Sequence, residues 1–443
     1  MKLRKGRAIG ALAVIALVGL GIAGCGKIVG EMTELGGASV AEPVQTEPAA
    51  TETPTTEPPP EDKVIHVVAA GDNLVQTSVY REASYHATDG TYNFLPMYEN
   101  VREIIEAGDI SILNQETLIC NGEYEVSGSN YNFNSPPELG DDMIDLGFNV
   151  FTLANNHVMD KGTDGIRAAL DYWDSRCVQN DITVLGAYRD NADADNIRTR
   201  EVNGVTVAFL SYAEHLNGYS IPSSSPYRVV LTSETGVMER QVRKAAEIAD
   251  VVIVSAHWGY EDTHEVSPEV KALAQNFVDW GADLIIGTHS HTAESMEFLT
   301  RADGTQGFVY YSLGNFISAQ TDNFNLVGEI ADLDIVVDGE TNEVTFENVG
   351  AIPVINHYDN GKFANMRLYP YYMYTEELAS GHGVPYAPYG YAKDFGMYVV
   401  DRIIEQNIPP QFRKLTEDRS APETSQAFAQ GNTENTTPGA TWQ

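Results

Sequence analysis

The sequence predicts an α/β fold, and three observations support this prediction. Apolar runs, typical of strands buried on both faces of a parallel sheet, occur at residues 251–254 and 284–286, and mainly apolar runs at 64–70 and 110–113 fit the same scheme. Segments with helical periodicity alternate with these runs. Hairpin patterns occur at 198–212 and 327–349. The body between the polar ends has roughly 350 residues, enough for one extended domain or one domain with additions.

In the first half of this body, each strand runs into polar side chains. The strand at 64–70 leads into Gly71-Asp72-Asn73, and the strand at 110–113 leads into Asn114-Gln115-Glu116. A third run, Phe151–Ala154, leads into Asn155-Asn156-His157. Helices are expected at 136–146 and 165–177, between and after these strands.

The second half repeats this scheme with histidine at the strand ends. Residues 198–212 predict two strands around the turn Asn203-Gly204. Helices are expected at 234–248 and 268–280, and the strands that follow them end at His257 and at His289. A strand is then expected at 309–313, before Asn315, and a hairpin at 327–337 and 344–349.

The strand ends supply a set of potential metal ligands. In an open α/β sheet, ligands bind outside the carboxyl ends of the strands, so these side chains are expected to meet. A mixed oxygen and nitrogen set suits manganese, iron or zinc rather than a metal selected by thiolates. The set is Asp72, Glu116, Asn156, His257, His289 and His291.

Each residue of this set also has an ordinary structural explanation. Asp72 could be a turn residue after Gly71, and Asn156 could be a turn or helix-entry asparagine. Glu116 could be a solvated charge, and a lone His257 would more often be a satisfied, partly buried histidine. The pair His289 and His291 is more specific, because alternate residues of an extended segment face the same side.

Six short motifs follow one another in an order that resembles the capsule-synthesis CapA family, within the calcineurin-like metallophosphoesterase superfamily. The resemblance covers roughly residues 63–360. It implies a four-layer αββα sandwich, in which two packed mixed sheets are flanked by helices. The motifs are Gly71-Asp72, Asn114-x-Glu116, Asn155-Asn156-His157 with Asp160 and Gly162, His257-Trp258-Gly259-x-Glu261, Gly287-x-His289-x-His291 and Ser312–Phe316.

The resemblance also implies roles for single residues. Asp72 matches the metal-binding aspartate of the first strand, Glu116 the acidic residue that bridges or flanks the metals, and Asn156 the metal-binding asparagine. His257, His289 and His291 match the three histidine ligands of the family. His157 matches the histidine that contacts the phosphoryl group or protonates a leaving oxygen, which makes it the expected catalytic residue.

The sequence departs from the wider superfamily at two places. The usual first motif is Asp-x-His, but here the residue two positions after Asp72 is Leu74, so one metal loses a ligand. Glu116 stands where aspartate is commoner. The CapA branch shows both changes, and they leave open whether the site holds one divalent ion or two and whether it acts as a phosphoesterase.

Such a site supports hydrolysis, because a bound divalent ion lowers the pKa of water from about 15.7 to about 7. His157 is then the natural general acid. Asp160 could orient His157 or cap the helix that begins near Thr163, and the cap is the favoured alternative. Glu261 could accept a hydrogen bond from a ligand imidazole or be an exposed loop charge. Asn315 could face the same site or be a turn residue.

The amino terminus predicts export. Met1–Arg7 is basic and Ala8–Ala23 is apolar, but this run is shorter than the about 20 residues that a membrane span needs. The segment Ile22–Cys25 resembles a bacterial lipobox, which implies a signal peptide at 1–24 and a lipid on Cys25. The alternatives are a plain signal peptide and an uncleaved anchor. The protein is therefore expected on the extracytoplasmic face of the bacterial cell membrane, lipid-anchored.

Polar segments are expected to flank the folded part. Residues 25–62 are rich in Thr, Pro and Glu, cannot bury a core and predict a disordered tether. In polyproline form this tether could span on the order of 100 Å. Residues 361–414 are expected to wrap the domain at 63–360 as an appendage, and 415–443 to form a disordered tail. Cys120 and Cys177 could pair or remain two isolated buried thiols.

The formal net charge of −36 argues against nucleic-acid binding, because no basic stripe is available to meet phosphates. The leading hypothesis is a metalloprotein that acts in synthesis, release or attachment of a capsular polymer such as poly-γ-glutamate. Expected partners are this polymer or a phosphorylated envelope substrate, the membrane, and membrane-embedded synthase subunits. The alternatives are a non-catalytic envelope scaffold and a general extracellular metallophosphoesterase.

Overall fold

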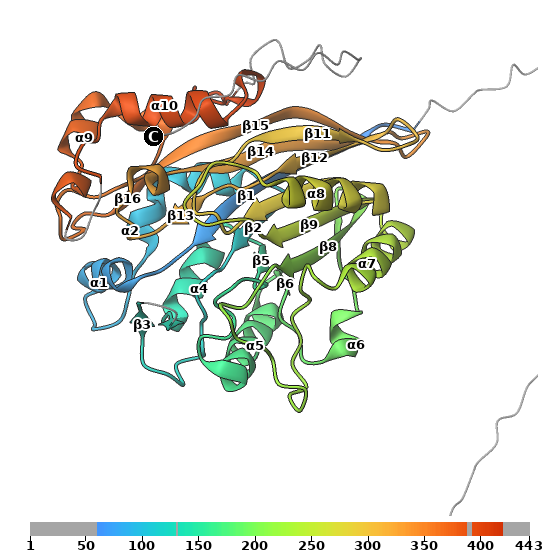
Figure 1. Cartoon of the computed structure of the whole chain (residues 1–443), viewed down its shortest axis with the longest axis horizontal. Coiled ribbons are helices and arrows are strands. Elements are labelled where there is room, and N and C mark those ends of the chain that lie inside the picture. The colour runs from blue at the N-terminus through green and yellow to red at the C-terminus, as the bar shows by residue number, and fades with distance from the viewer. Residues whose placement is uncertain (1–59, 130–131, 388–391, 420–443) are drawn as a thin grey trace, which may run out of the picture. The chain divides into compact units, whose positions relative to one another are not determined.

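A computed structural model describes residues 60–129, 132–387 and 392–419 (Figure 1). The expected signal peptide, Cys25 and nearly all of the expected tether lie outside these residues, as does most of the expected tail. Within the described ranges, no helix combines the length and the apolar character needed to cross a membrane.

The larger sheet has eight strands. Its parallel half consists of β1, β2, β5 and β6, and its antiparallel half adds β14, β15 and β16 beyond β1. The eighth strand, β13, pairs in parallel with the end of β1. The bounds are β1 Lys63–Asn73, β2 Ile110–Asn114, β5 Val150–Thr152, β6 Thr183–Leu185, β13 Asn315–Ile317, β14 Val327–Val337, β15 Val344–His357 and β16 Arg367–Pro370.

The smaller sheet has six strands in the order β11-β12-β10-β9-β8-β7. Its centre is parallel, from β8 through β9 and β10 to β12, and antiparallel strands close both edges. The bounds are β7 Arg198–Val202, β8 Val205–Ala213, β9 Val251–His257, β10 Leu284–Thr288, β11 Met296–Thr300 and β12 Gln306–Tyr310. A short separate hairpin joins β3 Ser127–Gly128 to β4 Phe133–Asn134.

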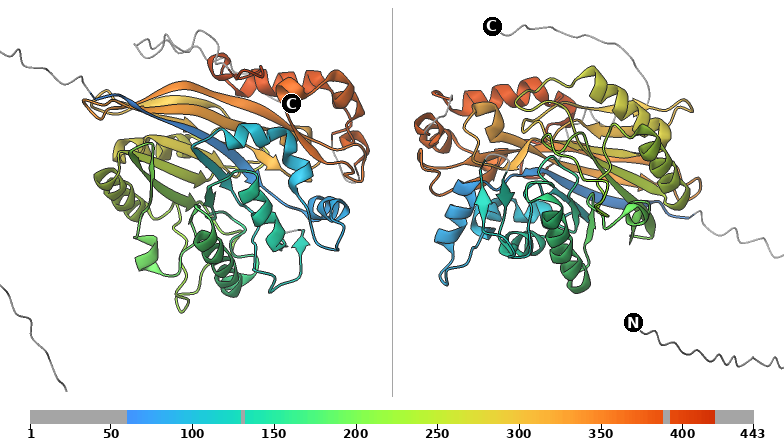
Figure 2. Two further views of the ribbon diagram at one scale, coloured as in Figure 1. Left: turned by 180° about the vertical axis from the view of Figure 1, so that it is seen from behind. Right: turned by 60° about the horizontal axis from the view of Figure 1, so that its bottom comes forward.

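Helices cover the outer faces of the two sheets, as Figures 1 and 2 show. On the smaller sheet, α7 Thr235–Ile248 contacts β8 and β9, and α8 Pro268–Trp280 contacts β11 and β12. On the larger sheet, α3 Arg102–Glu106 contacts β1 and α5 Gly162–Gln179 contacts β6, and α4 Pro137–Asp145 lies near α5 in Figure 1. The inner faces of both sheets share one hydrophobic core. The predicted four-layer α/β sandwich is therefore confirmed.

Local sequence explains the sharp bounds of α8. Ser267 accepts a hydrogen bond from the Val270 N–H at 3.2 Å and caps the amino end, with Pro268 at the first helical position. Gly281 ends the helix with a φ of 118°, in the left-handed region that glycine adopts without strain.

The remaining α-helices of the described residues lie at the periphery. They are α1 Thr77–His86, α2 Leu95–Tyr98, α6 Asn191–Ala194, α9 Glu376–Gly381 and α10 Met397–Asn407. Beyond β15, the chain forms β16, α9 and α10 alongside the antiparallel strands, drawn in orange and red in Figure 1. The Lys414 N–H donates to the Ala351 carbonyl of β15 at 3.0 Å and ties the end of this segment to the sheet.

One strand prediction was wrong. The run at 309–313 does not form a single strand, because β12 ends at Tyr310 and the chain then leaves the smaller sheet. It turns at Gly314, where φ is 65°, and joins the larger sheet as β13 beside Asp72. The other expected strands, helices and hairpins are confirmed to within a few residues, although β15 runs on to His357. Cys120 and Cys177 are free thiols, and Cys177 is exposed rather than buried.

Candidate metal centre

Asp72 lies at the end of β1, between β2 and β13, and its side chain is fully buried. Its Oδ1 accepts a hydrogen bond from Asn114 Nδ2 at 2.7 Å, and its Oδ2 accepts one from the His289 N–H at 3.2 Å. The same Oδ2 lies 3.1 Å from Nδ1 of His291. Asp72 therefore joins the first strand to the histidine loop of the other sheet.

Two glycines let the chain approach Asp72 this closely. The Asp72 N–H donates to the Gly314 carbonyl at 2.9 Å. A Cβ atom at Gly71 would lie 1.9 Å from that carbonyl oxygen, well inside contact distance. Only a residue without a side chain fits there, and this explains the Gly71-Asp72 motif.

The loop after β10 carries His289 and His291 in an unusual backbone conformation. Their φ angles are 101° and 58°, which non-glycine residues adopt rarely. The prediction that they lie on one face of an extended segment was therefore wrong. The tight turn still brings both imidazoles into the centre, with ring centroids 6.2 Å apart. Strained backbone of this kind is common at functional sites.

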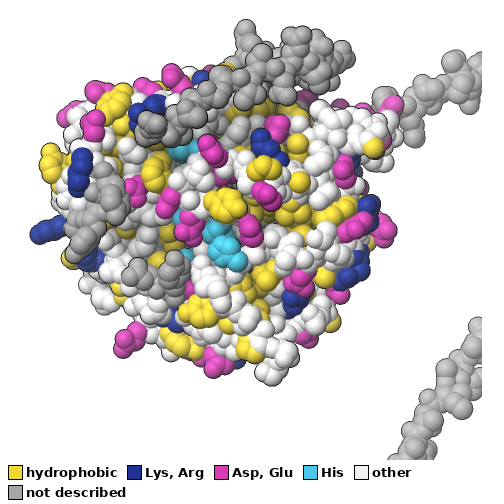
Figure 3. All heavy atoms as spheres, viewed as in Figure 1, with side chains coloured by type: hydrophobic (Ala, Val, Ile, Leu, Met, Phe, Trp, Pro, Cys, Tyr) yellow, Lys and Arg dark blue, Asp and Glu magenta, His cyan; other side chains and the backbone are white. Residues whose placement is uncertain are grey.

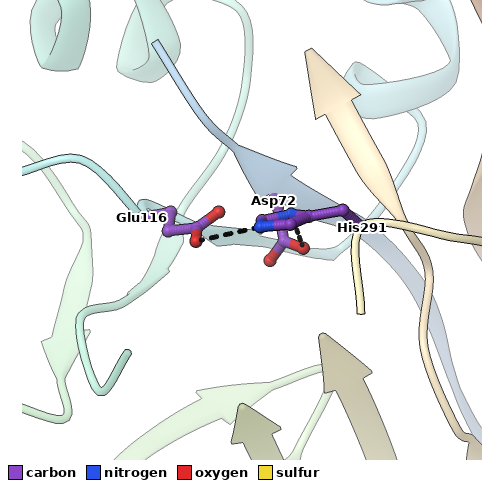
Figure 4. Close-up of side chains that lie close together, drawn as sticks. All are labelled: Asp72, Glu116 and His291. Atoms are coloured by element: carbon purple, nitrogen blue, oxygen red, sulfur yellow. Dashed lines mark hydrogen bonds and ion pairs between the residues drawn. The ribbon is translucent and has the colours of Figure 1, made fainter. Parts of the chain in front are cut away.

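Glu116 follows β2 and points its carboxylate at three histidines. Its Oε1 lies 3.8 Å from Nε2 of His157, 3.9 Å from Nε2 of His257 and 3.8 Å from Nε2 of His291. Figure 4 shows the His291 ring between the carboxylates of Glu116 and Asp72. Asp72, Glu116 and His291 each offer one potential ligand atom, and these three atoms lie within 4.8 Å of one another. The three residues therefore form a group that could hold a metal ion.

Burial and charge shift the pKa values in this group in opposite directions. Burial raises the pKa of Glu116 well above its usual range, and the neighbouring Asp72 raises it further. Burial also lowers the pKa values of His257 and His289 well below 6.5, with a further contribution from neighbouring histidines. For His291 the same desolvation is outweighed by Glu116 and Asp72, and its pKa rises to about 10.

The residues fit a divalent cation. Both carboxylate oxygens of Glu116 and Nδ1 of His289 are buried and have no hydrogen-bond partner in the protein. Buried charges are normally paired or bound to metals, and a cation here would satisfy these atoms at once. Two carboxylates with several neutral imidazoles form a donor set typical of manganese, iron or zinc sites.

Asn156 and His257 contact each other at the edge of this group. Oδ1 of Asn156 lies 3.2 Å from Nε2 of His257, whose Nδ1 lies 3.0 Å from Oγ1 of Thr288. The second imidazole nitrogen is thus fixed by Thr288, as is usual for a ligating histidine. Glu261 was expected to accept from a ligand imidazole, but it accepts from Asn156 Nδ2 at 3.4 Å instead.

His157 stands beside the centre with a carboxylate on either side. Its Nδ1 lies 2.9 Å from Oδ2 of Asp160, and its Nε2 faces Glu116. Asp160 also accepts the Phe133 N–H at 2.8 Å, and the Phe133 ring packs edge-on against the imidazole. The expected helix cap was wrong: Lys161 precedes α5, and Asp160 holds His157 instead.

Several residues around the centre were missed or left open by the sequence. Asn315 is buried, and its Nδ2 donates to Gln320 Oε1 at 2.7 Å and lies 3.4 Å from the His291 carbonyl. Its role is therefore to support the histidine loop. On the loop after β8, the His215 ring lies 4.9 Å from the His289 ring. Asn217, on the same loop, places its Nδ2 3.5 Å from Nδ1 of His157. No sequence signal marks these last two residues, because the contact depends on how a loop folds back.

Comparisons with known proteins agree with this picture. Residues 66–320, more than half of the chain, match the family model described as bacterial capsule synthesis protein PGA_cap. All six potential ligands fall in this range. The chain is 28% identical over 264 residues to the capsule biosynthesis protein CapA of Bacillus anthracis. It is 27% identical over 261 residues to the PGA biosynthesis protein CapA of Bacillus subtilis.

These matches are partial in length. They cover 59% and 58% of this chain, and 61% and 64% of the two Bacillus proteins, which is less than two thirds of each relative. Among solved structures, a phosphatase from Mycoplasma pneumoniae is 16% identical with a TM-score of 0.38, covering 67% of this chain and 95% of its own. A putative 5′-nucleotidase from Staphylococcus aureus is 15% identical with a TM-score of 0.39, covering 70% and 54%.

Proposed function

The chain belongs to the bacterial capsule synthesis protein family PGA_cap, and from this membership we propose that it acts in capsule polymer biosynthesis through a divalent metal centre. The two Bacillus relatives carry names that refer to capsule and PGA biosynthesis, which supports poly-γ-glutamate as the polymer. The proposed step is synthesis, release or attachment of this polymer, or hydrolysis of a phosphorylated envelope intermediate.

One observation carries the metal part of the proposal. Glu116 is a fully buried carboxylate with no hydrogen-bond partner for either oxygen, and it lies opposite three imidazoles and Asp72. An uncompensated buried charge is costly unless it neutralises or binds a cation. A metal ion held by Asp72, Glu116, Asn156 and the three histidines His257, His289 and His291 meets this requirement.

The residues around the metal centre have separate roles in the proposed reaction. A bound divalent ion supplies a Lewis acid and an activated water at neutral pH. Asp160 fixes the His157 ring through Nδ1, so that Nε2 is the nitrogen that faces Glu116 and would move a proton there. The aromatic edge of Phe133 restricts the ring from the side. Asn114 and Thr288 hold Asp72 and His257 in place.

We further propose that the protein works outside the cytoplasmic membrane, attached by lipid at Cys25. The basic and apolar segments at the amino terminus and the lipobox-like Ile22–Cys25 support this location. Membrane-embedded synthase subunits and the nascent polymer are the partners that this location offers. A tether of about 40 residues would let the folded domain reach into the cell wall.

Metal content tests the centre directly. The full chain is purified without added metal, and manganese, iron and zinc are measured together with binding of added Mn²⁺. Glu116→Gln is expected to lose most of the bound metal. Glu329→Gln is the matched control, because Glu329 is another fully buried glutamate without hydrogen-bond partners but lies outside the group of Asp72, Glu116 and His291. Equal metal content in wild type and Glu116→Gln would overturn the proposal.

A scaffold without catalysis is the second candidate, and Leu74 favours it. This buried leucine occupies the position where the wider superfamily has a histidine ligand. The site therefore has one metal ligand fewer. Complementation of a capsule-deficient strain distinguishes the two functions. Full restoration of capsule by His157→Ala would favour the scaffold, and loss of capsule with normal protein level would favour catalysis.

A further inference from the structure

One cavity of the molecule contains none of the residues of the metal centre. It has a volume of about 420 Å³ and lies between α1 and the loop that joins β15 to β16. Ser78, Arg81 and Tyr85 line it from the helix, at the spacing that puts side chains on one helix face. Residues 360–364 line it from the loop. We call this cavity the α1 groove, and its volume is within the range typical of ligand sites, about 300–1,000 Å³.

Both walls of the α1 groove are held in place by the protein itself. Nη2 of Arg81 donates to the Lys362 carbonyl at 2.9 Å, and the Asn365 N–H donates to Glu82 Oε1 at 2.8 Å. Phe363 is buried below the loop, with its ring 4.5 Å from the ring of Tyr358. The groove is therefore a formed site and needs no rearrangement before a ligand enters.

The charges in the groove are unusual for this acidic chain. Most described arginines pair with a carboxylate, for example Arg167 with Glu123 and Arg176 with Asp141. Arg81 and Lys362 line the groove together, and within the described ranges neither has a carboxylate within ion-pair distance.

The acidic side chain on the same wall does not neutralise these two cations. Glu82 is 6% exposed, accepts the Asn365 N–H and lies 3.5 Å from Nε2 of His86. The guanidinium of Arg81 uses only Nη2 for hydrogen bonds within the described residues, at 2.9 Å to Lys362 and 3.5 Å to Ser78. Its remaining donors can therefore bind a ligand. Figure 3 shows how widely acidic side chains are spread over one face of the molecule, which makes a cationic groove distinctive.

We propose that the α1 groove binds carboxylate groups of a polyanionic chain. A guanidinium can bind one carboxylate through two parallel hydrogen bonds, and the ammonium group of Lys362 can pair with a second. Tyr85 is 72% exposed beside them and offers an apolar face to the aliphatic stems between the carboxylates. Identifying the chain as poly-γ-glutamate rests on the proposed function; the recognition of carboxylates rests on the groove alone.

The position of the groove suggests how it serves the centre. α1 begins at Thr77, a short loop after the strand that ends in Asp72 and Asn73. A long chain held at the groove raises the local concentration of its other residues at the centre, as in any bivalent contact. Such local attraction is useful here, because the net charge of −36 repels a polyanion at long range.

Calorimetry with a synthetic γ-linked glutamate decamer tests the groove on the full chain. Arg81→Gln/Lys362→Gln is compared with Arg240→Gln/Arg243→Gln, which removes the same charge from the surface of α7. We expect the groove variant to bind the decamer at least about tenfold more weakly and the control to stay within about twofold of wild type. Thermal unfolding of both variants checks that they are folded.

The outcome of this comparison and two further measurements decide the interpretation. An equal loss in groove and control variants, or no loss in either, would overturn the proposal. Inorganic phosphate that binds as tightly as the decamer would overturn the assignment to a carboxylate chain. On chelator-treated protein the groove variant is still expected to bind the decamer more weakly than the control variant by the same factor, so failure of the metal centre and failure of the groove give different results.

Discussion

Oδ2 of Asp160 lies 2.9 Å from Nδ1 of His157, on the side of the imidazole that faces away from Glu116. This contact fixes which nitrogen of the imidazole faces the metal centre. Asn156 and His157 are adjacent in the sequence but have different partners. Asn156 contacts His257, and His157 contacts Asp160.

His157→Ala is expected to keep the metal and lose activity. The imidazole is not part of the group formed by Asp72, Glu116 and His291, and Asp160 fixes it from Nδ1 at 2.9 Å. We expect turnover of a model phosphodiester to fall about 100-fold or more, the usual effect of losing a general acid. Metal analysis and initial rates are measured on the same preparation.

Asp160→Asn serves as the companion variant for His157. An amide of the same size keeps the packing but removes the negative charge behind the imidazole. The expected result is a lower kcat with little change in KM and normal metal content. A loss of metal in either variant would mean that His157 belongs to the ligand set.

Added metal is expected to stabilise the fold. A ligand that binds only the native state adds about 2.7 kcal/mol to the free energy of unfolding at 100 times its Kd. Thermal unfolding of chelator-treated protein should therefore shift upward when Mn²⁺ or Zn²⁺ is added. Glu116→Gln should show a much smaller shift, and an identical shift in wild type and variant would contradict the assignment of Glu116.

Gly71→Ala is expected to disrupt the centre through the backbone. The new Cβ atom would meet the Gly314 carbonyl oxygen at 1.9 Å, and neither strand can move without displacing Asp72. We expect a loss of about 3 kcal/mol or more in the free energy of unfolding, with reduced metal binding. Gly236→Ala is the control, because the space around this α7 residue is open, and alanine should be neutral or slightly stabilising there.

Stability is expected to depend on pH through Glu294. Burial raises the pKa of this carboxyl to about 8 in the folded protein, against 4.5 as the ordinary value. The folded state then binds a proton that the unfolded state has lost, so this contribution is fully present below pH 4.5 and is lost as the pH rises toward 8. Glu294→Gln should flatten the fall in unfolding free energy over this window.

Denaturant unfolding at pH 5 and pH 8, in the presence of chelator, measures this effect. Glu247→Gln is the control, because Glu247 is exposed on α7 and its replacement should leave the wild-type pH dependence intact. Parallel curves for wild type and Glu294→Gln would show that another group controls the dependence.

Local patterns in the sequence predict much of the fold and many residues near the centre. An apolar run followed by Asp72, His257 or the His289 loop predicts both the strand and the position of the ligand within a few residues. Buried parallel strands are mainly apolar, and their carboxyl ends meet at one edge of the sheet. Such patterns do not predict contacts made far along the chain. The crossing of β13 to the larger sheet, and the approach of His215 to His289, depend on packing between distant segments.

The same limit explains the errors on single side chains. Asp160 lies one residue before the cap position of α5, which Lys161 occupies, and its carboxylate contacts the His157 imidazole and accepts the Phe133 N–H instead. Glu261 has the right spacing to support His257, but Thr288 from the next strand takes that place. In both cases the deciding partner is close in space and not marked by local periodicity.

The two halves of the metal centre come from different sheets, and Asp72 and His291 meet across a sequence separation of 219 residues. A metal ion at this point would act as a cross-link that closes a very long loop, which favours the folded chain by restricting the unfolded one. It would also act late, since contacts of such long range form slowly and only after both sheets exist. Metal uptake should therefore mark the end of folding, so a protein exported unfolded would acquire its ion at its destination.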